Sequence, residues 1–180
     1  MESMPELPGY KILEKVGEGA MAAVWTARQL SLDRVVDIKI LSPSLVRDEE
    51  AIQRFRLEAQ AAAKLNHPGI VQIYDAGSHE GLVYLVMEFV AGCTVGALLE
   101  RKRRLAEKNA LLVAQGVALA LAYAWNEARL IHCDVKPANV LVDQDGSIKI
   151  TDMGLAKVFG TNVPGSGREM LEGTPHYVSP

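Results

Sequence analysis

The sequence predicts an α+β fold in two parts, in which a strand-rich region with one helix is followed by a partly helical region. Two observations carry this prediction. Between residue 10 and about residue 92, apolar and polar side chains alternate in short runs, which is typical of half-buried strands. Residues 110–125 are almost all apolar, which is typical of a core helix. The length of 180 residues allows one domain, or one larger and one smaller lobe.

The first part reads as strands that surround one helix. Residues 10–16 alternate and lead into a Gly-Glu-Gly turn and a second strand. Residues 35–41 and 82–87 are two further predicted strands. Between them, three carboxylates at residues 48–50 favour a helix start, and Asn-His-Pro-Gly at residues 66–69 favours its end.

Composition and charge exclude some classes of protein. The net charge of −3 and the pI near 5.8 give no sign of a basic face, so we expect no nucleic-acid partner. Cys93 and Cys133 have neither metal-ligand spacing nor a disulfide framework, which favours a reducing compartment. The first ten residues hold no apolar run of a signal peptide, and residues 110–125 are shorter than the about 20 residues of a bilayer span. We therefore expect a cytoplasmic protein with a buried helix, and leave open a membrane anchor beyond residue 180.

Two short apolar runs near the end of the chain predict a hairpin with polar residues at its open end, which we call the hairpin mouth. Residues 140–142 and 148–150 read as strands, with the Asp-Gly pair at 145–146 as a two-residue turn. That turn places Asn139 opposite Asp152, at the roughly 4.5–5.5 Å separation of paired residues. An amide oxygen beside a carboxylate suits a magnesium ion. A plain β-hairpin is the alternative interpretation of this pattern.

The residues around this hairpin match a known motif. Residues 131–140 read Ile-His-Cys-Asp-Val-Lys-Pro-Ala-Asn-Val, and residues 150–154 read Ile-Thr-Asp-Met-Gly. They resemble the catalytic loop and the metal-binding loop of serine/threonine protein kinases, usually His-Arg-Asp-Leu-Lys-Pro-x-Asn and Asp-Phe-Gly. The sequence of these motifs is most similar to that of bacterial kinases of eukaryotic type, and the resemblance runs from about Tyr10 to the last residue. Cys133 and Met153 depart from it, where arginine and phenylalanine are usual.

The resemblance implies a two-lobed kinase-like fold whose second lobe is partial. Its boundaries are an N-terminal tail at residues 1–9, an N-lobe at 10–87, a hinge at 88–92, and a C-lobe at 93–180 with the catalytic loop and activation segment. The implied reaction is transfer of the γ-phosphoryl of Mg·ATP to serine or threonine hydroxyls of a protein substrate. The alternative is a pseudokinase, or a truncated kinase-like interaction module. With half of the helical lobe missing, we expect residues 110–125 to expose an apolar flank on which the chain self-associates.

The family pattern also implies roles for the polar residues of the hairpin region. Asp134 would orient a substrate hydroxyl and accept its proton, and Lys136 would neutralise the γ-phosphate. Asn139 and Asp152 would hold magnesium. The spacing of Lys136 from Asp134 favours a serine/threonine kinase over other phosphotransferases.

Residues 17–24, Gly-Glu-Gly-Ala-Met-Ala-Ala-Val, resemble the glycine-rich loop that covers nucleotide phosphates, with Ala22 in place of the third glycine. A simple hairpin turn is the alternative. In the hinge, the backbone C=O of Glu88 and the N–H of Val90 would bind adenine, and a plain strand end is the alternative. The resemblance therefore implies nucleotide binding by Val16, Gly17, Gly19, Val24, Lys39, Glu88, Val90, Lys136, Asn139 and Asp152.

Lys39 is the expected partner of a helix carboxylate. Strand alternation puts Lys39 and Asp37 on one face of their strand. Glu58 falls within an apolar helical stripe that includes Phe55, and an unpaired buried carboxylate costs several kcal/mol. The family resemblance supplies Lys39 as its partner, so both are assigned to the catalytic set. A strand lysine that faces solvent is the alternative.

Asp37 stands where the resemblance puts a small alanine packed on the adenine ring. A carboxylate there would compete with Glu58 for Lys39 and would lose water when adenine binds. A cost of about 2 kcal/mol would weaken nucleotide binding more than tenfold. In the alternative, Asp37 tilts away and pairs with Lys39 or solvent.

The end of the chain reads as an activation segment. Residues 173–180, Gly-Thr-Pro-His-Tyr-Val-Ser-Pro, resemble the peptide-binding end of that segment. Cys133 removes the arginine that normally reads a phosphorylated loop. Thr161, Ser166 and Thr174 are candidate phosphorylation sites.

Overall fold

The computed structural model describes residues 4–19, 21–152 and 157–158, and within these the side chains of Arg54, Glu58, Lys157 and Val158 fall outside the description. The chain divides into two compact units. Unit 1 comprises Met1–Ala59 with Gln72–Phe89, and unit 2 comprises Gln60–Val71 with Val90–Pro180. Each unit has its own sheet, so each is described separately. The fold is α+β, as the sequence predicts.

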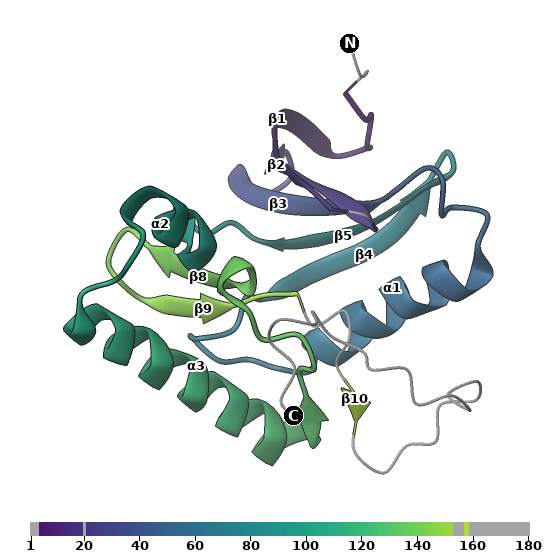
Figure 1. Ribbon diagram of the computed structural model, residues 1–180. Helices are drawn as coiled ribbons and strands as arrows, with labels where there is room; N and C mark the ends of the chain where they lie inside the picture. Colours follow the sequence, from purple (N-terminus) through teal and green to yellow (C-terminus); the bar gives the residue numbers. More distant parts are fainter. Residues whose placement is uncertain (1–3, 20, 153–156, 159–180) are drawn as a thin grey trace. The chain divides into compact units, whose positions relative to one another are not determined.

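Unit 1 is built on a five-stranded antiparallel sheet (Figure 1). Its strands are β1 (Tyr10–Glu18), β2 (Ala22–Gln29), β3 (Arg34–Leu41), β4 (Ile73–His79) and β5 (Leu82–Glu88). The order across the sheet is β1-β2-β3-β5-β4. The helix α1 (Glu49–Ala62) lies between β3 and β4 in the chain. The strands predicted at residues 35–41 and 82–87 are therefore confirmed.

Alternation along the strands gives the sheet two apolar faces. One face carries the buried cluster Leu7, Trp25, Ala27, Val36, Ile38, Ile40 and Val86. The other carries Ala22, Leu41, Val83 and Leu85, which pack with Phe55 and Ala59 of α1. Burial on this scale is worth about 1.5–3 kcal/mol for each large side chain. The prediction that Val36, Ile38 and Ile40 share a face is confirmed.

The sequence of α1 explains both where it begins and which side it buries. The carboxylate Oδ1 of Asp48 accepts the backbone N–H groups of Glu50 at 3.0 Å and Ala51 at 3.2 Å, which caps the first turn. Phe55 is 2% exposed and anchors the apolar stripe. The helix ends at Ala62, shortly before the predicted stop signal.

The edge strand β4 was not predicted from the sequence. It runs over Ile73–His79, and most of its side chains are exposed or half-buried. Because β4 lies at the edge of the sheet, burial imposes no period-2 pattern on it. Its pairing with β5 defines it instead.

Unit 2 combines two helices with short strands (Figure 1). Its elements are β6 (Gly92–Thr94), α2 (Val95–Lys102), α3 (Glu107–Ala128), β7 (Leu130–Ile131), the 3-10 turn η1 (Pro137–Asn139), β8 (Val140–Asp143), β9 (Ile148–Ile150) and β10 (Lys157–Val158). The strands form a sheet of order β6-β8-β9 and a pair β7-β10. Thr94 caps α2 through its hydroxyl, which accepts the N–H of Ala97 at 3.0 Å. The predicted helical region 93–130 thus contains two helices, with a strand residue or two at each end.

The loop between β8 and β9 differs from the predicted two-residue turn. The N–H of Asp143 donates to the carbonyl of Ser147 at 2.9 Å, so three residues, 144–146, form the loop. Gly146 has a φ of +86°, the left-handed conformation that closes a three-residue hairpin loop. The Asp-Gly pair is a correct hairpin signal, but the predicted loop length is wrong.

The longer loop shifts the hairpin register by one residue. Val140 pairs with Ile150, and the N–H of Thr151 donates to the carbonyl of Asn139 at 3.0 Å. Asn139 is therefore opposite Thr151, and the predicted pairing of Asn139 with Asp152 is wrong. Asp152 lies one residue beyond the paired position.

The helix α3 packs against β9 through its smallest residue. A Cβ on Gly116 would lie 2.7 Å from the Cβ of Ile148, so a larger side chain would push the two elements apart. The buried residues of α3 are Ala120 and Ala124. Small residues thus set a close approach between the helix and the sheet of unit 2.

The opposite side of α3 is apolar and exposed. Leu111, Leu112 and Leu119 are 63%, 51% and 58% exposed, and Trp125 is 37% exposed. At 100° per residue these four side chains share one broad face, which we call the α3 apolar face. The expectation of a buried helix is wrong for this face, whereas the expected exposed flank is confirmed. None of the described helices has the length and apolar content for a bilayer crossing.

Candidate active site

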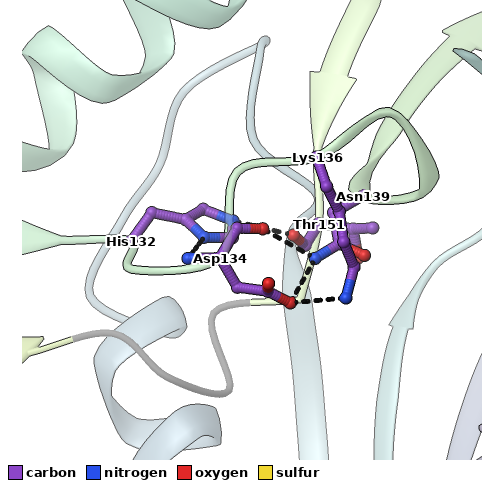
Figure 2. A network of polar contacts seen from close by, with 5 residues as sticks. All are labelled: His132, Asp134, Lys136, Asn139 and Thr151. Carbon is purple, nitrogen blue, oxygen red and sulfur yellow. Dashed lines mark hydrogen bonds and ion pairs between the residues drawn. The ribbon is translucent and has the colours of Figure 1, made fainter. Parts of the chain in front are cut away.

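The loop between β7 and β8 in unit 2 contains three of the polar residues that the sequence singles out, Asp134, Lys136 and Asn139 (Figure 2). The turn η1 reverses the chain so that Asn139 lies against Asp134. The side-chain Nδ2 of Asn139 donates to the backbone carbonyl of Asp134 at 2.9 Å and to its carboxylate Oδ2 at 3.1 Å. Asn139 is 4% exposed, so these hydrogen bonds are shielded from water and fix the loop.

Lys136 completes a three-residue network around the same carboxylate. Its Nζ lies 2.7 Å from Oδ2 of Asp134, which also receives the Asn139 amide (Figure 2). The side chains of Lys136 and Asp134 are 27% and 13% exposed. Because two donors converge on one oxygen, the direction of the Asp134 carboxylate is set by its neighbours.

His132 ties the loop to the end of β9 (Figure 2). Its Nδ1 accepts the N–H of Asp134 at 3.2 Å, so its Nε2 carries the proton and donates to the carbonyl of Thr151 at 3.0 Å. His132 is 2% exposed, and this burial lowers the pKa of its imidazole. Its hydrogen bonds and the charges of Asp134 and Asp152 act in the opposite direction, raising that pKa. The ring is therefore a neutral link between the loop and the hairpin at neutral pH.

The sequence had not assigned His132 a role. Its place in the quoted motif was visible, but a histidine in a motif does not reveal whether it is buried or which carbonyl it binds. The tautomer follows from the N–H of Asp134, which only the folded loop places against Nδ1.

Asp152 follows β9 and is exposed, with a φ of +68°. The charges of Asp152 and Asp134 both raise the pKa of the His132 imidazole. The structure thus gathers Asp134, Lys136 and Asn139 into one hydrogen-bonded network and places Asp152 directly after Thr151, whose carbonyl accepts the Nε2–H of His132.

The residues at the hairpin mouth fit a magnesium ion. The Nδ2 of Asn139 is committed to Asp134, so Oδ1 is the atom of this side chain that can face a cation. Asp152 offers an exposed carboxylate. Magnesium takes hard oxygen ligands, usually one or two carboxylates together with phosphate oxygens and water. Within the described residues, no three His, Cys, Asp or Glu side chains gather into a metal site.

Lys39 lies on the α1 side of the unit 1 sheet. It pairs across the sheet with Val24 on β2 and Leu85 on β5. Its Nζ lies 5.9 Å from the ring centroid of Phe55, which is within the range of a cation–π contact. The side chain of Glu58 falls outside the described residues, so the predicted Lys39–Glu58 ion pair stays a prediction.

Asp37 shares this face with Lys39 and has a partner that the sequence did not suggest. The hydroxyl of Thr26, its cross-strand neighbour, donates to Oδ1 of Asp37 at 2.8 Å. Thr26 is 4% exposed. Burial raises the pKa of the Asp37 carboxyl, and the Thr26 hydrogen bond opposes that rise. The alternative interpretation paired Asp37 with Lys39 or solvent, whereas in the structure Thr26 holds it on the sheet. The β2–β3 register could have predicted this neighbour.

The end of β1 and the turn that follows it carry the glycines of the predicted phosphate loop, with Gly17 on β1 and Gly19 in the turn. The N–H of Gly19 donates to the carbonyl of Ala22 at 2.9 Å, which closes the turn. A Cβ on Gly17 would meet no atom within 4 Å, so this backbone borders open space. Val16 is exposed and Val24 is half-buried. Ala20, at the tip, lies outside the described residues.

Glu88 is fixed at the end of β5. Its N–H donates to the carbonyl of Gln72 at 2.8 Å, and its Oε2 accepts the N–H of Gln72 at 3.2 Å. Val90, in unit 2, is buried, and its carbonyl accepts the N–H of Gly92 at 2.8 Å. The predicted contacts of Glu88 and Val90 with adenine stay predictions.

Cys133 occupies the position of the missing arginine. It has a φ of +61°, a backbone conformation that is uncommon outside glycine, and its thiol donates to the carbonyl of Ile131 at 3.5 Å. Met153, Thr161, Ser166 and Thr174 lie outside the described residues, as does the predicted peptide-binding end at 173–180.

Comparison with known proteins confirms the resemblance over nearly the whole chain. The sequence profile of the protein kinase domain matches residues 10–180. The chain is 41% identical over 171 residues to the serine/threonine-protein kinase PrkC of Bacillus subtilis, which covers 95% of this chain and 26% of that protein. It is 40% identical over 178 residues to the serine/threonine-protein kinase PknA of Mycobacterium tuberculosis, which covers 95% of this chain and 40% of that protein.

A third relative gives the same result. The chain is 37% identical over 179 residues to the serine/threonine-protein kinase pkn3 of Myxococcus xanthus, which covers 95% of this chain and 32% of that protein. The chain therefore spans about a quarter to two fifths of the length of these three relatives. The profile match, these identities and the antiparallel sheet with its catalytic-loop network agree, and the chain belongs to the protein kinase family.

Proposed function

We propose that this chain is the front part of a serine/threonine protein kinase that transfers the γ-phosphoryl of ATP to a protein hydroxyl. The observation that carries the proposal is the network in which Lys136 and Asn139 both contact Oδ2 of Asp134. A carboxylate held in this way presents a fixed proton acceptor next to a cation. No geometry among the described residues favours the non-catalytic alternative.

Each residue of the network has a role in the proposed transfer. The substrate hydroxyl oxygen forms a bond to the γ-phosphorus while the bond from that phosphorus to the bridging oxygen breaks and ADP leaves. In this proposal Asp134 accepts the proton of the hydroxyl, and Lys136, whose Nζ lies 2.7 Å from Oδ2 of Asp134, would neutralise charge on the transferred group. Asn139 keeps the carboxylate in position through its two hydrogen bonds.

Magnesium is the implied metal, and Asn139 Oδ1 and Asp152 are the groups that would hold it. When bound, the ion would neutralise negative charge on the nucleotide phosphates. His132 supports this arrangement, because its hydrogen bond to Thr151 holds the residue that precedes Asp152.

Most of the other residues proposed to bind the nucleotide belong to unit 1, and Val90 belongs to unit 2. Lys39 would contact phosphates, paired with Glu58 as in the family pattern. Gly17 and Gly19 would bring backbone N–H groups close to the phosphates, with Val16 and Val24 beside the base. Glu88 and Val90 would bind adenine through their backbone.

Other features of the whole protein are also proposals. The lobe boundaries at residues 10–87, 88–92 and 93–180 follow the family pattern. The free thiols of Cys93 and Cys133 support a reducing, cytoplasmic location for this chain. The substrate would be a serine- or threonine-containing protein, and no nucleic acid is expected to bind. The α3 apolar face supports self-association of the isolated chain.

Phosphoryl transfer tests the proposal in a longer protein that contains this chain. Asp134→Ala should lower the rate of phosphorylation of a serine/threonine protein substrate by about 10²–10⁴-fold, because the proton acceptor is lost. Nucleotide binding should change little. Glu100→Ala, which removes an exposed carboxylate of α2, is the matched control and should keep the activity. Unaltered activity after Asp134→Ala would refute the assignment.

A further inference from the structure

One titratable group on the proposed nucleotide-binding face has no role in the proposed reaction. Asp37 lies two residues before Lys39 on β3, on the same side of the sheet. It is half-buried and hydrogen-bonded to the Thr26 hydroxyl at 2.8 Å. Thr26 is itself almost fully buried, so this hydroxyl has little freedom to turn elsewhere. The pair is therefore a fixed feature of the face.

A charged carboxylate at this place works against a bound base. The faces of aromatic rings carry negative charge density, so an anion above the ring is repelled. The base would also remove water that still solvates the carboxylate, and burial of an uncompensated charge is costly. A neutral carboxyl group of the same size avoids both penalties.

We propose that Thr26 and Asp37 form a charge filter for the nucleotide base, in which charged Asp37 opposes binding and its protonated form admits the base. This inference rests on the proposed ATP-binding function of the same face. Thr26 is a positioning residue, because its hydroxyl donates to the carboxylate and so favours the charged form. Burial favours the neutral form and raises the pKa of Asp37, so proton uptake occurs at a higher pH than for an exposed aspartate.

The charged groups nearest to Asp37 on the sheet lie on its own strand and on β2. On its own strand, Lys39 shares the face. On β2, Arg28 lies two residues beyond Thr26 and forms an ion pair with Asp33, in which Nη1 lies 2.8 Å from Oδ1. On β5, the residue opposite Asp37 is the apolar Met87.

The helix α1 reaches this face through Phe55, whose ring meets Lys39. Among the charged residues of α1, the family pattern assigns Glu58 to Lys39, and the side chain of Glu58 lies outside the described residues. Thr26 is thus the neighbour whose hydrogen bond the structure assigns to Asp37.

Adenosine binding measured by calorimetry across a pH series tests the filter. Adenosine lacks phosphates, so titration of phosphate groups and magnesium does not enter the result. Affinity of the unchanged protein should rise as the pH falls through the raised pKa of Asp37, since Asp37 then takes up a proton. Asp37→Asn, a neutral side chain of equal size, should bind at least about tenfold more tightly near neutral pH, or about 1.4 kcal/mol. Its affinity should hardly depend on pH across this series.

Two variants of Thr26 separate positioning from packing. Thr26→Val keeps the shape but removes the donor, so the pH at which adenosine affinity rises should move upward. Thr26→Ser keeps a hydroxyl and should retain the original profile. A purely structural role of Thr26 would change stability without moving the profile.

The outcomes are distinct. Equal affinity and equal pH dependence of the unchanged protein and Asp37→Asn would overturn the filter and leave ATP binding intact. Tighter binding by Asp37→Ala but not by Asp37→Asn would show that size, not charge, limits the base, and would also overturn it. If no variant binds adenosine or Mg·ATP while all of them unfold cooperatively, the nucleotide-binding proposal fails together with the filter.

Discussion

The two units differ in how completely they bury apolar surface and pair their buried carboxylates. Unit 1 buries both faces of its sheet, yet keeps the carboxylate of Asp37 half-buried with one neutral donor. Unit 2 gives the carboxylate of Asp134 two donors, one of them a cation, yet leaves the α3 apolar face exposed. Local departures of this kind are expected at functional sites and at surfaces that bind partners. The difference indicates that the energetically unfavourable feature of unit 1 is a half-buried carboxylate, whereas that of unit 2 is an exposed apolar surface.

The largest expected effect comes from the satisfied network of unit 2. Asn139→Leu removes both hydrogen bonds to Asp134 and leaves a shielded carbonyl without its donor. We expect the free energy of unfolding to fall by about 1–3 kcal/mol, measured by urea denaturation. Phosphoryl transfer in the longer protein should also be lost. Gln144→Leu, an amide in the exposed hairpin loop, is the control and should change stability by less than about 0.5 kcal/mol.

The exposed helix gives the next effect. Exposed apolar patches larger than a few hundred Å² mark association sites, so the isolated chain should form dimers or larger species at micromolar concentration. Leu112→Glu with Leu119→Glu should shift it toward monomer in light scattering. Leu32→Glu changes a leucine of similar exposure in unit 1 and should leave association unchanged. If the unchanged chain were monomeric and unfolded in one cooperative thermal transition, the α3 apolar face would not drive association, and this prediction would be wrong.

The sequence predicts those parts of each unit that depend on local chemistry. The Asp48 cap, the Phe55 stripe and the β3 alternation follow from residue type and spacing alone. The hairpin register does not, because one extra loop residue shifts every pair and the Asp-Gly signal fits both loop lengths. β4 escapes prediction because an edge strand need not alternate.

The candidate site divides in the same way. Asp134, Lys136 and Asn139 were predicted together because the motif sets their spacing, and η1 brings them into contact. Thr26 and His132 depend on contacts made across strands and loops, which a linear pattern does not contain. Burial of His132 is a property of the folded loop alone.

His132 predicts how stability in unit 2 depends on pH. Burial lowers the pKa of the folded imidazole below its ordinary value of about 6.5, so the unfolded chain takes up a proton first as the pH falls. Stability should be complete above about pH 6.5 and should decline below it, with the steepest loss between the unfolded and the folded pKa. His132→Gln should weaken this dependence in urea denaturation curves. His79→Gln changes the last residue of β4 in unit 1, outside the catalytic loop, and is the control substitution.

Asp37 predicts a smaller effect of the opposite sign in unit 1. Its folded pKa is raised, so the folded protein binds a proton that the unfolded chain has already lost as the pH rises above about 3.9. The contribution of Asp37 to stability is therefore present at low pH and is lost as the pH rises through the raised pKa. Asp37→Asn carries no charge to desolvate and keeps an acceptor for Thr26, so near neutral pH it should stabilise the protein by up to about 1 kcal/mol. Asp33→Asn, which changes an exposed aspartate at the β2–β3 turn, is the control and should shift stability less. A less stable Asp37→Asn protein would mean that the hydrogen bond from Thr26 to the charged carboxylate outweighs the cost of burying its charge. The conclusion that the Asp37 carboxylate is an unfavourable feature of unit 1 would then be refuted.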